Sequence, residues 1–88
     1  MDKKQLIKKL KDIQKAMKDL IEKLEKTKAK DKQIKINLQL LWYNTKCINM
    51  LWLWKDLQII NREKANKEIA KRILENKEIY NKLLLLKQ

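Results

Sequence analysis

The absence of glycine and proline constrains this 88-residue chain more than any residue that is present. Both residues provide backbone angles that tight hairpins and phosphate-binding loops require, and serine, another common turn residue, is absent too. Long helices need none of the three. Leu is the commonest apolar residue, whereas Val and Phe, which favour strands, do not occur. The sequence therefore predicts an all-α fold.

Apolar residues recur at alternating spacings of four and three near the N-terminus, which is typical of an amphipathic helix with coiled-coil-like packing. The six positions are Leu6, Leu10, Ile13, Met17, Leu20 and Leu24. We predict a helix over about residues 2–29. The apolar rhythm is lost over residues 27–33, the expected first connection, where we expect Asp31 to cap the next helix.

The central residues 34–60 contain all three tryptophans and only four charged residues, and their pattern fits two structures. Every second residue from Ile34 to Trp42 is apolar, which is the period of a half-buried strand. That alternative is an α-β-β-α fold with a hairpin whose strands cover about 34–42 and 47–54. On a helix, the same residues form two opposite apolar faces, as the middle member of three helices requires. Because the supposed turn has no glycine, we favour a helix over about residues 32–60.

The C-terminal part predicts a third helix over about residues 61–86, with Asn61 as its N-cap. The expected apolar seam contains Ile69, Ile73, Tyr80 and Leu83. Asn66 and Asn76 fall in the same seam, where they either fix the helix register or lie at its solvated edge. The chain as a whole, residues 1–88, is then a single-domain three-helix bundle or a helical hairpin-type assembly.

A chain this short buries a small core, so we expect a homo-oligomer or an obligate partner to contribute further apolar contacts. The bulkiest apolar residues lie in the central segment, and we assign them to the core or to an interface. They are Trp42, Leu51, Trp52 and Trp54.

Catalytic chemistry has few candidate residues in this sequence. There is no His, no Ser and a single cysteine, Cys47, so neither a nucleophile-and-base pair nor a zinc shell is expected. Gly-rich nucleotide-binding loops are excluded by composition. We expect no enzyme activity, no cofactor and no metal site, and we interpret Cys47 as a small buried apolar residue.

The formal charge of +12 predicts an acidic partner. Five lysines lie opposite the N-terminal seam in one helical stripe about 21 Å long: Lys4, Lys8, Lys11, Lys15 and Lys18. Such a stripe suits contact with the phosphates of nucleic acid or a ribonucleoprotein, although a merely solvated face has the same pattern. Only Arg62 and Arg72 are present for bidentate base contacts. The abundance of Lys, Ile and Asn is also typical of an AT-rich genome, so the choice of Lys over Arg supports no argument.

Two alternative functions remain open from the sequence. One is a protein-binding inhibitor, immunity-type or adaptor protein that docks on an acidic partner. The other is peripheral attachment to an anionic membrane through the basic first helix. Integral membrane insertion is not expected, because polar residues interrupt the central segment. The N-terminus lacks the apolar core of a signal peptide, and a lone cysteine suits a reducing compartment, so we expect a cytoplasmic protein.

Overall fold

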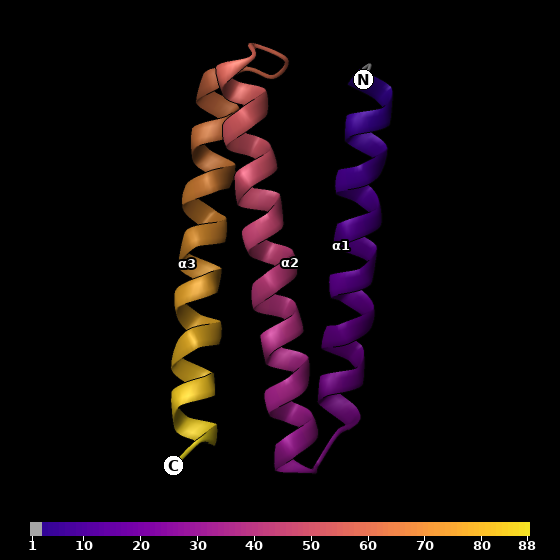
Figure 1. Cartoon of the computed structure of the whole chain (residues 1–88), viewed down its shortest axis with the longest axis vertical. Coiled ribbons are helices and arrows are strands. Elements are labelled where there is room, and N and C mark those ends of the chain that lie inside the picture. Colours follow the sequence, from indigo (N-terminus) through magenta and orange to yellow (C-terminus); the bar gives the residue numbers. More distant parts are fainter. Residues whose placement is uncertain (1–2) are drawn as a thin grey trace.

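Three helices run antiparallel in succession in the computed structural model, which describes residues 3–88 (Figure 1). Helix α1 covers Lys3–Lys26, α2 covers Lys30–Asp56 and α3 covers Arg62–Leu86. Helix α2 lies between the other two and packs against both, in a body of 43 × 21 × 14 Å. The all-α prediction is confirmed. The hairpin alternative is wrong, since residues 34–54 lie within α2 and residues 3–88 contain no strand.

The core stripe of α2 explains why the alternating pattern does not give a strand. Leu40, Cys47, Leu51 and Trp54 are buried at helical spacings of three, four and seven. Leu38, which alternation would place on the same face as Leu40, is exposed. Both neighbours of α2 are helices, so packing selects every third or fourth residue of this segment and not every second one.

The core consists of two clusters along the helix axes, and α1 contributes its predicted seam to both. Of that seam, Leu6, Ile13 and Met17 are buried and the other three residues are half-buried. Ile13 and Met17 pack with Leu40 of α2, and Leu6 packs with the cluster that contains Trp54. The first helix is therefore held in the bundle by the face that its sequence predicts.

The first connection is shorter than predicted and covers residues 27–29. Thr27 Oγ1 donates to the Lys23 carbonyl at 2.6 Å, and Gln33 Nε2 donates to the Thr27 carbonyl at 2.8 Å. Asp31 is not the cap of α2, because Ala29 holds that position without a side-chain hydrogen bond. The helix α1 ends at Lys26, and its predicted start at residue 2 lies outside the described residues.

The N-cap of α3 is the predicted one. Asn61 has extended backbone angles, and its Oδ1 accepts from the amides of Glu63 at 2.9 Å and Lys64 at 3.2 Å. These bonds satisfy two of the amides that the first turn of a helix leaves unpaired, so Asn61 fixes where α3 begins.

The helix α2 ends at Asp56, four residues before the predicted end, in a turn closed by backbone bonds. The amide of Ile59 donates to the Trp54 carbonyl at 2.9 Å, and the amide of Gln58 donates to the Lys55 carbonyl at 3.1 Å. This is a Schellman cap, and Ile59 also packs on the cluster that contains Trp54. Gln58 takes the left-handed position, with φ of 60°, that glycine usually occupies.

Replacing Gln58 with glycine is expected to stabilise the protein by about 1 kcal/mol, because glycine has no Cβ to resist the left-handed angles. The free energy of unfolding in urea measures this effect. The same change at the exposed helical position Gln14 is the matched control, and it is expected to destabilise by about 1 kcal/mol. Destabilisation of similar size at both positions would contradict the proposed strain at Gln58.

Candidate functional site

The three tryptophans have two different environments. Trp54 is 3% exposed and lies in the core with Leu51, whereas Trp42 is 58% and Trp52 45% exposed. The prediction of a core position is therefore wrong for Trp42 and Trp52, and their role in an interface stays a prediction. Trp42 follows the buried Leu40 by two residues, and Trp52 precedes the buried Trp54 by two. Two residues correspond to a rotation of about 200° around the helix axis, so each exposed indole lies on the side of α2 opposite its buried neighbour.

Each exposed indole is accompanied by a lysine of the same helix. Lys46 Nζ lies 5.0 Å from the ring centroid of Trp42, and Lys55 Nζ lies 3.7 Å from that of Trp52. Tyr43 packs edge-on against Trp42, with centroids 5.0 Å apart. Cation–π contacts at exposed sites contribute about 0.5–1 kcal/mol and orient the rings. Even with these contacts, both indoles remain open to solvent.

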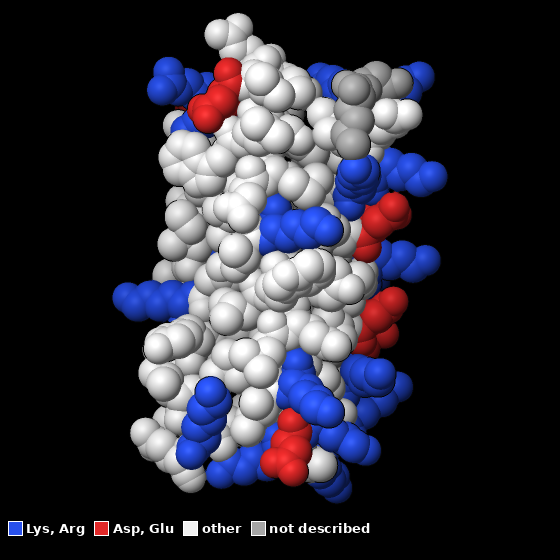
Figure 2. All heavy atoms as spheres, viewed as in Figure 1, with Lys and Arg blue, Asp and Glu red and all other residues white. Residues whose placement is uncertain are grey.

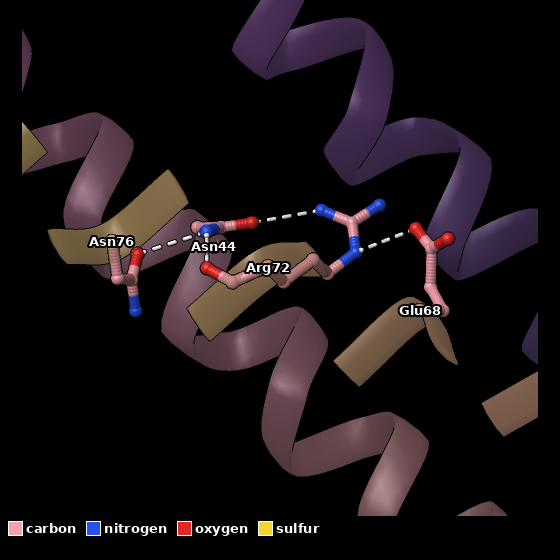
Figure 3. A network of polar contacts seen from close by, with 4 residues as sticks. All are labelled: Asn44, Glu68, Arg72 and Asn76. Atoms are coloured by element: carbon pink, nitrogen blue, oxygen red, sulfur yellow. Dashed lines mark hydrogen bonds and ion pairs between the residues drawn. The ribbon is translucent and has the colours of Figure 1, made fainter. Parts of the chain in front are cut away.

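A buried polar network joins α2 to α3 (Figure 3). Asn44 Nδ2 donates to the Arg72 carbonyl at 2.8 Å and to Asn76 Oδ1 at 2.9 Å. In return, Arg72 Nη1 donates to Asn44 Oδ1 at 2.8 Å. Arg72 Nε lies 3.1 Å from Glu68 Oε1, an ion pair whose geometry falls outside that of a hydrogen bond. Asn44 and Arg72 are both buried, so the network is a polar layer inside the helix interface.

Sequence reasoning missed Asn44 and misjudged Arg72. Arg72 is 5% exposed, so it is not available for base contacts, and Arg62 is the remaining arginine. Asn76 does lie in the seam, where it contacts Asn44, whereas the exposed Asn66 accepts from Lys55 Nζ at 3.0 Å. Asn44 follows Leu40 by four residues and precedes Cys47 by three. The burial of Asn44 could therefore have been predicted from this spacing, once residues 34–54 were known to form a helix.

Cys47 is fully buried beside this polar layer. Burial raises the pKa of the Cys47 thiol, and this effect exceeds the opposing one of the positive charge of Arg72. The thiol is therefore neutral near pH 7 and is a poor nucleophile. The described residues also bring together no group of three or more His, Cys, Asp or Glu side chains that could hold a metal ion.

A surface groove of about 580 Å³ lies between α1 and α2. Its lining includes Asp19, Glu22 and Lys23 from α1 and Gln39 and Tyr43 from α2. Charges of both signs line the groove, but it contains no nucleophile with an adjacent base.

The five-lysine stripe lies on the outward face of α1, opposite the buried seam. Lys4, Lys8, Lys11, Lys15 and Lys18 are all exposed, and none forms an ion pair within 4.0 Å with another described residue. Figure 2 shows Lys and Arg side chains along the α1 side of the molecule with a few acidic groups among them, whereas the surface over α2 and α3 in that view is mostly uncharged. The structure thus separates the cationic side of α1 from a face over α2 and α3 that has fewer charges in that view.

Comparison with known proteins gives no match, whether with family models, with curated proteins or with solved structures. Within residues 3–88, no helix has both the length and the apolar character needed to cross a bilayer.

Proposed function

We propose that this protein is a non-enzymatic binding module whose helix α1 contacts the phosphates of nucleic acid. The observation that supports the proposal best is the lysine stripe, because its five side chains are exposed, aligned and free of ion pairs with described residues. A rigid helix presents them over about 21 Å, a length that spans about six phosphates of one strand at 3.4 Å each.

The same stripe implies binding that is largely independent of base sequence. Lysine is a point charge without the planar fork with which arginine reads guanine. Arg72 is occupied in the core, which leaves Arg62 at the start of α3. Asp12 and Asp19 share the exposed surface of α1 and weaken its potential, so we expect modest affinity that depends steeply on salt.

Changing Lys8, Lys11 and Lys15 to glutamine is expected to make the negative slope of log K against log salt shallower by about 2.7 for duplex DNA, because each phosphate contact contributes about −0.9 to that slope. Fluorescence anisotropy over a range of salt concentrations with a labelled duplex measures this slope. The matched control changes three exposed lysines of α3, namely Lys64, Lys67 and Lys71, to glutamine, which removes the same charge. Equal slopes for the two triple variants, or no binding by the unchanged protein at low salt, would contradict the proposal.

The alternative functions have less support from this arrangement. Membrane attachment through the apolar face of α1 would require α1 to leave the bundle, because that face is buried against α2. The lysine stripe lies on α1, whereas the exposed tryptophans lie on α2. An acidic protein partner would therefore have to contact two helices to use both features. A stoichiometric protein companion that stays bound after nuclease treatment at high salt would favour the protein-binding alternative.

A further inference from the structure

The line of contact between α2 and α3 is open on the side that α1 does not cover. Two exposed hydrogen bonds cross this line of contact: Asn76 Nδ2 donates to Thr45 Oγ1 at 3.1 Å, and Lys55 Nζ donates to Asn66 Oδ1 at 3.0 Å. Helix α1 packs on a different side of α2, through Leu40 and Cys47. Residues in helical register with Thr45 and Asn66 therefore lie along the open side.

Several large apolar residues are in that register. Leu38 and Trp52 lie seven residues before and after Thr45, and Ile73 lies seven residues after Asn66. Residues seven apart share one face of a helix. Tyr80 continues the α3 row, and Trp42 and Leu84 follow Leu38 and Tyr80 by four residues. The six exposed residues Leu38, Trp42, Trp52, Ile73, Tyr80 and Leu84 are called the α2–α3 face below.

The described residues expose about as many large apolar side chains as they bury apolar ones. Among the described residues, twelve large apolar side chains are exposed, whereas the buried core has eleven apolar residues. Single exposed apolar residues are normal, but a contiguous patch indicates a surface that binds something. Figure 2 shows a largely uncharged surface over α2 and α3, in agreement with such a patch.

We infer that the α2–α3 face binds a second copy of this chain. Two adjacent helices about 40 Å long present a strip about 20 Å wide, or about 800 Å², which is what each partner buries in a stable complex of standard size. A strip made of two antiparallel helices packs on its own copy through an isologous contact, giving a core of two α2 and two α3 helices.

Three lysines lie among the apolar residues of the α2–α3 face. Lys46 lies over the ring of Trp42 and Lys55 over the ring of Trp52. Lys77 lies between Ile73 and Tyr80 in the sequence of α3. The long side chains of these lysines can extend their charges to the rim of a contact. A partner surface rich in carboxylates would have to desolvate them against the apolar side chains of the face, which is costly. Two copies meeting through this face keep the lysines of α1 outside the contact, so their mutual repulsion is limited.

Sedimentation equilibrium of the full chain tests this inference, after nuclease treatment and in about 0.5 M salt so that nucleic acid cannot bridge the copies. We expect the unchanged protein to have the mass of a dimer at micromolar concentration. Changing Ile73 and Leu84 together to glutamate is expected to raise the dimer Kd at least about 100-fold, because both charges would enter the contact. Circular dichroism should give unchanged helix content, since both side chains are exposed in the monomer.

The matched control changes Ile7 and Ile21 of α1 to glutamate, two exposed apolar residues outside the face. This variant is expected to remain a dimer. A monomeric mass for the unchanged protein across the concentration range would overturn the inference, as would equal dissociation of both variants. Binding to anionic vesicles that is lost in the Ile73→Glu/Leu84→Glu variant, without any dimer in solution, would replace the second copy with a membrane surface. Because high salt removes nucleic acid binding but not apolar contacts, failure here is distinguishable from failure of the lysine proposal.

Discussion

Replacing Trp54 with alanine is expected to lower the free energy of unfolding by about 3–5 kcal/mol, the range for deleting a buried aromatic side chain. The indole is 3% exposed and packs with Leu6 of α1, Leu51 of α2 and Ile69 of α3, so its loss opens a cavity where all three helices meet. Urea unfolding followed by far-UV circular dichroism measures the change. A chain of this length has a total stability of only about 4–13 kcal/mol, so the variant is at the edge of folding.

The exposed tryptophans provide the controls for this experiment. Trp42→Ala and Trp52→Ala, measured at a concentration where the protein is monomeric, are expected to change the stability by less than about 1 kcal/mol. Trp54→Leu retains part of the buried volume and keeps the comparison measurable if Trp54→Ala does not fold. Equal losses at Trp42, Trp52 and Trp54 would contradict the distinction between core and surface positions in α2.

Replacing Asn44 with alanine is expected to lower the free energy of unfolding by about 2–4 kcal/mol, because it leaves the Nη1 group of the buried Arg72 without its hydrogen-bond acceptor. Arg72 Nη1 would lose its 2.8 Å bond to Asn44 Oδ1, and Asn76 Oδ1 would lose the 2.9 Å bond from Asn44 Nδ2. Water has little access to this layer, since Asn44 and Arg72 are both buried. Thermal and urea unfolding both measure the loss.

Two further variants separate the network from a general effect of losing an asparagine. Asn49→Ala, at an exposed position of the same helix, is expected to change stability by less than about 0.5 kcal/mol. The double variant Asn44→Leu/Arg72→Met replaces the polar layer with apolar side chains and is expected to recover most of the lost stability. If Asn44→Ala and Asn49→Ala behaved alike, the Asn44–Arg72 contact would not contribute to the stability of the bundle.

The polar layer also bears on how α2 and α3 align. Leu and Ile side chains pack in many registers, whereas the bonds between Asn44 and Arg72 form in one antiparallel register only. A shift of one helical turn would remove the bond from the buried Arg72 Nη1 to Asn44 and leave the guanidinium with its ion pair to Glu68 of the same helix, which is costly. We expect the double apolar variant, although stable, to align its helices less uniquely.

Local sequence signals determined the parts of the fold that depend on neighbouring residues. The seam from Leu6 to Leu24 fixed both the existence of α1 and its inward face, because one apolar stripe with charges on the other sides has a single favourable orientation. Asn61 fixed the start of α3, since its side chain bonds amides only two and three residues away. The end of α2 was missed because Gln58 holds a left-handed position in which glycine would have been the visible signal.

The sequence by itself determined that the chain is helical, basic and poor in catalytic side chains, since those properties follow from composition and local spacing. Only the tertiary structure decided which side of α2 turned inward, because that helix is apolar on two faces and its own pattern does not distinguish them. Because of the positions of α1 and α3, Leu51 and Trp54 are buried, and so are the polar Asn44 and Arg72. Trp42 and Trp52 lie on the other side of α2 and are exposed. The physical reason is that burial depends on complementary neighbours as well as on hydrophobicity.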